Sequence, residues 1–321
     1  MTDSSPRTYA FFEGEFVPLG DAKVSVMTHA FNYGTGVFEG IRSYWNDEHK
    51  ESYVFRLREH FVRFLKNTAM VFIDVPYGVD ELVEMTVNLL RMEGFPSDMY
   101  IRPLAYKSSE QIGVSMEGVA DGFTLFAVPY GKYIETDRPL SLCVSSWRRS
   151  SDNAIPSRAK VTGNYINTAL AKNEAVRNGY NEAIVLNEHG YVCEGSAENI
   201  FLVRNGALIT PSIADGILEG ITRDTIIRLA REELGIPTHE RQVARTEVYY
   251  ADEVFLTGTG AEVGPVGNVD GRTIGGGQIG PITAALQDLY FDVVKGRKPG
   301  YSDWLTPVGL TRRSETAAPV A

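Results

Sequence analysis

The feature that most constrains the fold is a break in regular structure near the middle of the chain. Pro129, Gly131 and Pro139 fall close together there, a composition typical of a linker between domains. With 321 residues, the chain is long enough to form two domains, each with its own core. The segments we expect are a small domain over 1–128, a linker over 129–140, a large domain over 141–308 and a flexible tail over 309–321.

Short apolar runs and amphipathic stretches alternate in both halves, which predicts a mixed α/β (α+β, two-domain) fold. The strands expected are 9–12, 16–19, 23–26, 54–57, 100–104, 125–129, 140–146, 183–186, 198–203, 207–210 and 252–257. The helices expected are 59–69, 79–92, 164–178, 223–234 and 282–295. Pro103 is expected to end its strand, and Thr222 to cap the helix that follows it. Gly179 is expected to end the helix over 164–178.

Composition argues against several classes of protein. With 41 acidic and 31 basic residues, the net charge of −10 is unsuited to a nucleic-acid surface. No apolar run approaches the roughly 20 residues of a membrane span, and the N-terminus lacks the pattern of a secretion signal. The two cysteines form no Cys-x-x-Cys pair, and the five histidines show no metal-ligand spacing. We therefore expect a cytoplasmic protein that binds no metal, no nucleic acid and no membrane.

The segment Ser157–Tyr165 carries a candidate nucleophile, Lys160. The lysine stands just before an expected helix, among apolar and small residues. Loss of water there would lower its pKa and make the neutral amine available to attack a carbonyl. Tyr165 follows at the mouth of the helix. A single lysine is most often a solvated surface charge, so the assignment depends on other segments.

A second segment, Tyr191–Asn199, places the carboxylate of Glu194 among small residues. Such a carboxylate is often part of a turn, but it can also partner a protonated pyridine nitrogen. Four further segments carry motifs: the glycine-rich stretch 29–42, His-x-x-Arg at 60–63, Tyr-Ile-Arg-Pro-Leu at 100–104 and Gly-Ile-Thr-Arg at 220–223. Taken together, and in the order in which they occur along the chain, the six segments resemble the fold-type IV pyridoxal 5'-phosphate (PLP) aminotransferases. The resemblance is closest to the branched-chain amino-acid aminotransferases. The resemblance spans roughly residues 10–308.

The resemblance implies a D-amino-acid-aminotransferase-like architecture, with PLP between a small N-terminal and a larger C-terminal domain. Lys160 would hold the cofactor as an imine and then move the α-proton of the substrate. An amino group would pass between branched-chain L-amino acids and 2-oxoglutarate. The resemblance implies cofactor contacts for Arg63, Lys160, Tyr165, Glu194, Ile221, Thr222 and Thr259. It implies substrate contacts for Tyr33, Phe38, Tyr100, Arg102, Tyr130, Tyr133, Gly260 and Ala261.

Two of these implied roles also have a physical basis. The guanidinium of Arg63 can donate two parallel hydrogen bonds to phosphate oxygens. The expected helix start at Ile221 and Thr222 offers free N–H groups and a positive dipole end. Because sites of this fold are typically completed by a second subunit, we expect a homodimer or a higher homo-oligomer, with Tyr33 reaching toward the partner's site.

Three kinds of alternative stay open. An (R)-selective amine transaminase, a D-amino-acid transaminase or an aminodeoxychorismate enzyme would keep the cofactor, although Arg102 and the segment 112–114 favour the branched-chain choice. A non-catalytic binding protein on the same scaffold would be expected to lack Lys160 or Glu194. A nicotinamide-dependent dehydrogenase is remote, because the glycines after 252–257 lack G-x-G-x-x-G spacing and Pro265 blocks the long helix.

Overall fold

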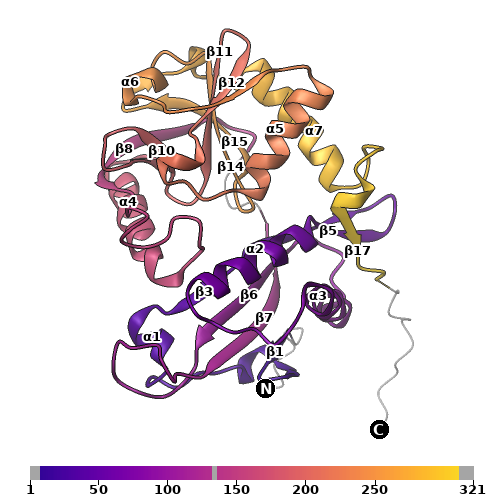
Figure 1. The fold of residues 1–321 in the computed structure, drawn as a ribbon. Helices are drawn as coiled ribbons and strands as arrows, with labels where there is room; N and C mark the ends of the chain where they lie inside the picture. The colour runs from indigo at the N-terminus through magenta and orange to yellow at the C-terminus, as the bar shows by residue number, and fades with distance from the viewer. Residues whose placement is uncertain (1–7, 132–135, 311–321) are drawn as a thin grey trace.

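The computed structural model describes residues 8–131 and 136–310. The helices of four or more residues are α1 (His29–Tyr33), α2 (Leu57–Met70), α3 (Val79–Glu93), α4 (Tyr165–Arg177), α5 (Ile221–Glu233), α6 (Arg245–Val248) and α7 (Pro281–Val294). These helices pack on two sheets and form two lobes with them. In Figure 1 the indigo-to-magenta N-terminal lobe lies below the orange C-terminal lobe.

The N-terminal lobe is an antiparallel sheet with strand order β17-β5-β4-β6-β7-β1-β2, and β3 also pairs with β6. Its strands are β1 (Tyr9–Phe12), β2 (Glu15–Pro18), β3 (Gly36–Phe38), β4 (Ile41–Asn46), β5 (Glu51–Phe55), β6 (Met99–Lys107), β7 (Asp121–Pro129) and β17 (Leu305–Pro307). Side chains alternate between the two faces of a strand. Ile41 and Ile101 therefore pack in one core with Phe61 of α2 and Leu89 of α3. The opposite face is left to line a cavity.

The C-terminal lobe is a mixed sheet with strand order β10-β9-β8-β15-β14-β11-β12-β13, and β16 pairs with β15. Its strands are β8 (Leu140–Arg148), β9 (Glu182–Leu186), β10 (Val192–Gly195), β11 (Asn199–Arg204), β12 (Ala207–Thr210), β13 (Thr238–Glu240), β14 (Glu253–Gly258), β15 (Glu262–Val269) and β16 (Arg272–Thr273). The parallel pairs are β8–β9, β8–β15 and β12–β13. Small side chains such as Ala171 and Ala183 let α4 pack closely on this sheet, while α5 and α7 pack around Phe201 and Phe255.

The two lobes are joined by buried contacts and by the end of the chain. The hydroxyls of Tyr44 in β4 and Tyr290 in α7 lie 3.1 Å apart, and both side chains are buried. Strand β17 returns from the C-terminal lobe and pairs with β5. The expected large domain over 141–308 therefore contributes its last strand to the N-terminal sheet. Within the described ranges, no helix is long and apolar enough to cross a membrane.

Four predicted details of secondary structure are wrong. Residues 23–26 form no strand. Pro103 does not end its strand, because β6 changes partner from β4 to β3 at that point and no ladder hydrogen bond needs the missing N–H. Thr222 is not the cap of α5, since the helix begins at Ile221 after Gly220. The cap residue of α4 is Asn178 and not Gly179, which follows it with a φ of +83°.

Candidate active site

A cavity of about 300 Å³ lies between the two lobes. Its N-terminal wall consists of Phe38, Gly40, Arg63, Tyr100, Arg102 and Tyr130. Its C-terminal wall is built from five segments that are far apart in the sequence; Lys160, Tyr165, Glu194, Thr222, Thr257 and the loop Thr259–Ala261 belong to it. The volume is within the range of small-molecule sites. Most side chains that the sequence analysis singled out therefore meet in one place.

Lys160 is fixed against strand β3 by backbone hydrogen bonds. The Phe38 N–H donates to the Lys160 carbonyl at 3.1 Å, and the Gly163 N–H donates to the Gly34 carbonyl at 3.0 Å. Gly34 has a φ of +67°, and a Cβ there would lie 2.7 Å from the Gly163 Cα, so a side chain would push the two segments apart. The glycine-rich stretch therefore holds the segment that carries Lys160, in addition to forming a tight turn.

The amine of Lys160 lies inside the cavity and donates to the Tyr165 hydroxyl over 2.6 Å. Tyr165 is the first residue of α4, which gives its ring a rigid base. Burial alone would lower the pKa of Lys160, but the Tyr165 oxygen and the Glu39 carboxylate outweigh it, so the pKa is raised above its usual value. The expectation of a lowered lysine pKa is therefore wrong for the chain without its cofactor.

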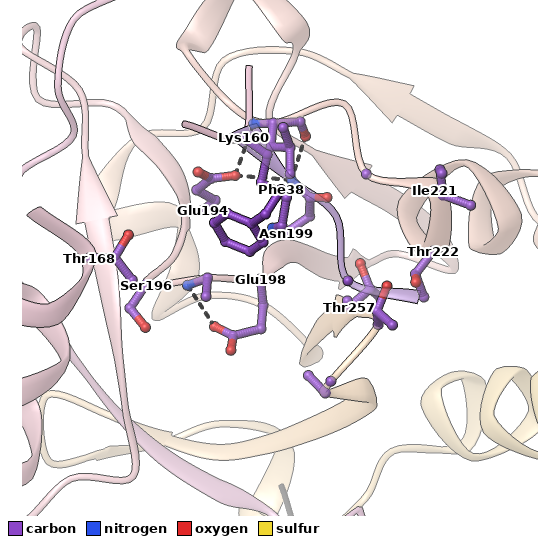
Figure 2. A pocket seen from close by; sticks show the side chains of 18 of the residues that line it. Phe38, Lys160, Thr168, Glu194, Ser196, Glu198, Asn199, Ile221, Thr222 and Thr257 are labelled. Carbon is purple, nitrogen blue, oxygen red and sulfur yellow. Dashed lines mark hydrogen bonds between the residues drawn. The ribbon is translucent and has the colours of Figure 1, made fainter. Parts of the chain in front are cut away.

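Glu194 is buried in β10 and has partners on both carboxylate oxygens. Its Oε1 lies 3.0 Å from Arg149 Nη2. Its Oε2 accepts from Asn199 Nδ2 at 3.2 Å and from the Leu218 N–H at 3.1 Å. Burial raises the pKa of Glu194, and Arg149 and the Leu218 N–H offset this only in part. The carboxylate is thus held in a fixed orientation toward the cavity, as Figure 2 shows.

Arg63 faces the cavity from α2 and is oriented by a buried carboxylate, Glu39. Arg63 Nε and Nη2 each donate to Glu39 over 2.7 Å, and Nη1 donates to the Glu219 carbonyl at 2.7 Å. His60 Nδ1 lies 2.9 Å from Glu39 Oε2. Burial would raise the pKa of Glu39, but Arg63 and His60 together hold it well below its usual range. The two remaining N–H bonds of Arg63 are left for a ligand.

The start of α5 forms one end of the cavity. Ile221, Thr222 and Thr257 lie together at the right of Figure 2. No side chain caps the first turn of α5, so its N–H groups are available to an anion. Thr257 Oγ1 is buried and has no hydrogen-bond partner among the described residues, although buried hydroxyls normally have one. This arrangement suits a phosphate group, and the primary amine of Lys160 and the carboxylate of Glu194 suit the carbonyl and ring nitrogen of PLP.

The N-terminal wall is one face of the first sheet. Phe38, Tyr100 and Arg102 share this face, and the Arg102 guanidinium lies 4.3 Å from the centre of the Phe38 ring. Arg102 Nε donates to the Tyr100 hydroxyl at 3.1 Å. The Tyr100 and Tyr130 rings are 5.1 Å apart. Aromatic rings therefore surround Arg102 at this wall.

The predicted substrate residue Tyr33 is not in this wall. Tyr33 lies outside the cavity of its own chain, where its hydroxyl accepts from the Gly113 N–H at 2.9 Å. Tyr133 lies outside the described residues. The loop with Thr259, Gly260 and Ala261 does line the cavity, and it joins the antiparallel strands β14 and β15. That hairpin is not the strand–turn–helix unit of a dinucleotide site, so the dehydrogenase alternative loses its support.

Several residues at the site were not predicted from the sequence. Glu39 and Asn199 stand inside the recognised motifs and could have been examined as partners of Arg63 and Glu194. Arg149 follows another arginine at the end of β8, and nothing in the local sequence distinguishes the two. Glu198 is buried, lines the cavity, and has its pKa raised to about 8 by burial and by the nearby Glu182.

Comparison with known proteins agrees with this geometry. A family profile described as amino-transferase class IV matches residues 36–269. A probable branched-chain-amino-acid aminotransferase of Aquifex aeolicus is 49% identical over 308 residues, which cover 96% of this chain and 99% of that protein. The chain belongs to the class IV aminotransferases.

Two solved structures are also similar. The branched-chain aminotransferase of the archaeon Thermoproteus uzoniensis with norvaline has a TM-score of 0.90 at 46% identity, covering 94% of this chain and 99% of that one. The PLP form of the branched-chain amino acid aminotransferase of Thermobaculum terrenum has a TM-score of 0.91 at 41% identity, covering 95% and 99%. The predicted fold-type IV architecture is thereby confirmed.

Proposed function

We propose that this protein is a PLP-dependent transaminase that transfers the amino group between branched-chain L-amino acids and 2-oxoglutarate. The observation that carries the proposal is the buried amine of Lys160, 2.6 Å from the Tyr165 hydroxyl, in the same cavity as the fixed carboxylate of Glu194. An amine can form an imine with the PLP carbonyl, a carboxylate can partner its ring nitrogen, and a phenol can hydrogen-bond its ring oxygen. Relatives and structural neighbours named as branched-chain aminotransferases support the same activity.

The residues that would hold PLP are those with matching chemistry. Lys160 would carry it covalently, Tyr165 would contact its phenolic oxygen, and Glu194 would contact its ring nitrogen. For the phosphate, we propose Arg63, whose Nη1 donates to the Glu219 carbonyl just before α5, together with Ile221, Thr222 and Thr259. When bound, PLP supplies a positively charged ring that accepts electrons from the substrate α-carbon.

The protein's own groups then position the substrate and move its proton. The Lys160 amine, held over the cavity by β3, takes the proton from the substrate α-carbon. The Glu194 carboxylate keeps its orientation because Arg149 and Asn199 bind both of its oxygens. The cavity lies between the lobes, which limits the access of water to the reacting atoms.

The N-terminal wall supports the choice of substrate. Phe38, Tyr100 and Tyr130 offer apolar surface for an aliphatic side chain, and we propose that Arg102 and the loop Gly260–Ala261 receive carboxylate oxygens. Tyr133 is proposed as a further aromatic residue of the pocket. The relatives' names make an (R)-amine or D-amino-acid specificity less favoured.

We also propose that the enzyme is a homodimer, with Tyr33 near the partner's cavity. Around Tyr33, Val26 is 76% exposed, Phe31 is 70% exposed and Val114 is 81% exposed. The bond from Gly113 to Tyr33 brings these two segments together, and such an apolar patch is typical of a subunit interface. Sedimentation of wild type and Phe31→Glu tests this, since a monomeric wild type would refute it. Cytoplasmic location is proposed because both cysteines are free, as is usual in a reducing compartment.

The absorbance spectrum of the purified protein tests the function. We expect a visible band from the bound cofactor that L-leucine converts to the pyridoxamine form. A band that responds to (R)-1-phenylethylamine and not to L-leucine would overturn the branched-chain choice and keep PLP. No band after addition of PLP would overturn the cofactor assignment.

A further inference from the structure

Arg42 is a buried arginine that stands just outside the cavity and contacts both lobes. It lies in β4, and only 3% of its surface is exposed. In the ladder between β4 and β6 it is paired with Tyr100, so the two side chains share the sheet face that lines the cavity. Gly40 lies on the same face, where a Cβ would clash with the Tyr100 hydroxyl at 2.7 Å. Arg42 is therefore directly adjacent to the N-terminal wall.

On one side, Arg42 binds the chain where it leaves β7. Its Nη2 donates to the Tyr130 carbonyl at 3.3 Å and to the Gly131 carbonyl at 3.0 Å. The guanidinium also lies 5.7 Å from the centre of the Tyr130 ring, which lines the cavity. The position of Tyr130 thus depends on Arg42 through both its backbone and its ring.

On the other side, Arg42 binds a strained residue of the C-terminal lobe, Glu262. The distance from Arg42 Nη1 to Glu262 Oε1 is 3.3 Å. Glu262 is buried and follows the loop Thr259–Ala261 directly, with a φ of +55°. Such a backbone conformation is uncommon for a residue other than glycine, and here the residue is also buried. Here the Arg42 guanidinium and the Tyr44 hydroxyl hold the Glu262 carboxylate.

We propose that Arg42 is a positioning residue that sets the shape of the substrate site, holding Tyr130 from one side and, through Glu262, the loop Thr259–Ala261 from the other. The inference rests on the proposed function, which assigns these residues to the substrate. A guanidinium suits the task because Nη2 can donate to the two carbonyls while its delocalised charge forms an ion pair with the Glu262 carboxylate. Substrate binding should depend on Arg42 more strongly than cofactor binding does.

The test compares the wild-type holoenzyme with Arg42→Lys, Arg42→Gln and Glu262→Gln. For each we would measure KM for the amino donor and the oxo acid, the Kd of PLP by absorbance titration, and Tm. In Arg42→Gln we expect KM to rise about 10- to 100-fold, the usual effect of losing hydrogen bonds from a charged group, with the Kd of PLP within about 2-fold. Glu262→Gln keeps the shape of the side chain and should raise KM about 3- to 10-fold. In the double variant Arg42→Gln/Glu262→Gln, KM should rise by less than the product of the two single increases, because both substitutions remove the same contact.

Arg56 provides a matched control. It is also buried and also joins the lobes, but at the start of α5, where its Nη1 donates to Asp224 Oδ2 at 2.6 Å and to the Ile221 carbonyl at 3.3 Å. Arg56→Gln should therefore weaken PLP binding more than substrate binding. The same pattern in Arg42→Gln and Arg56→Gln would mean that both act only by loosening the contact between the lobes, and would overturn the inference.

Two further results would also contradict the positioning role of Arg42. An unchanged KM with a lowered Tm in the Arg42 variants would make Arg42 merely structural, and independent effects in the double variant would contradict a shared contact. If Arg42→Gln fails to fold, the KM values of Arg42→Lys and Glu262→Gln still show whether Arg42 positions the substrate site. Wild type is assayed in parallel with L-leucine and (R)-1-phenylethylamine. Inactivity with both refutes the proposed function and the inference with it, whereas an active wild type with unchanged KM in the variants overturns the inference alone.

Discussion

The two walls of the cavity are built in different ways. The N-terminal wall is mostly one face of one antiparallel sheet, on which Phe38, Tyr100 and Arg102 follow from the alternation of side chains along β3 and β6. The C-terminal wall combines loops, strand ends and the start of α5 from segments that are far apart in the chain. Its polar groups are fixed by pairing, as in Lys160 with Tyr165 and Glu194 with Arg149.

The difference teaches how shape and chemistry are divided in this enzyme. A sheet face presents a fixed row of side chains, which suits the recognition of a substrate by shape. Buried amines and carboxylates keep defined positions and protonation only when partners hold them, which suits chemistry. Substitutions of Lys160 and Glu194 in the C-terminal wall should therefore lower kcat, whereas those of Tyr100 and Arg102 in the N-terminal wall should raise KM.

The largest effect is expected for Lys160→Ala. Removing the amine removes both the proposed attachment of the cofactor and the base that moves the α-proton, so kcat should fall by at least about 10³-fold. Steady-state turnover of L-leucine and 2-oxoglutarate measures this. Lys66→Ala, at an exposed position of α2, serves as the control and should retain wild-type kcat. A Lys160→Ala variant that kept a tenth of the wild-type kcat would contradict the assignment of the chemistry to the C-terminal wall.

The next effect is expected for Glu194→Gln. The amide keeps the size of the side chain but cannot hold a proton on the ring nitrogen of the cofactor, so kcat should fall about 10²- to 10³-fold while KM changes little. Steady-state kinetics with L-leucine and 2-oxoglutarate test this, with Glu188→Gln in an exposed turn as the control. An equal rise in KM would show that Glu194 acts on substrate binding instead.

A smaller effect of the opposite kind is expected for Arg102→Lys in the N-terminal wall. Lysine keeps the charge but loses the paired N–H geometry, so KM should rise about 10- to 100-fold with little change in kcat. Tyr100→Phe removes only the hydroxyl to which Arg102 donates, and should raise KM less. A loss of kcat in Arg102→Lys without a change in KM would contradict the division of roles between the walls.

The smallest effect concerns Glu198, a buried carboxylate that no ion pair joins to a described lysine or arginine. The folded chain keeps its proton up to a pKa of about 8, whereas the usual value is 4.5. Between these pH values the unfolded state binds fewer protons, so rising pH favours unfolding. Glu198→Gln in the cofactor-free protein should therefore gain about 5 °C in Tm relative to wild type between pH 5 and pH 8. A Tm difference that is constant with pH would contradict the raised pKa.

Much of the fold and part of the candidate site could be predicted from the sequence. The helices over 57–70, 79–93 and 281–294 lie within two residues of the predicted bounds, because their apolar periodicity is strong. Lys160, Tyr165 and Glu194 were found because their chemistry is distinctive and their segments match a known family. The local rules failed at Pro103 and Thr222. At Pro103, the strand changes partner from β4 to β3, which depends on residues distant in sequence. At Thr222, the helix begins one residue earlier, after Gly220.

The sequence by itself determined the chemical groups of this protein: an amine, a carboxylate, a phosphate-compatible helix start and an aromatic, arginine-bearing sheet face. Only the tertiary structure decided which partners hold them. Arg149 on Glu194, Glu39 on Arg63 and Arg42 on Glu262 join residues far apart in the chain, and no local pattern encodes such pairs. The raised pKa of Lys160 follows from the same cause, because a buried charge takes its pKa from neighbours that only folding brings close.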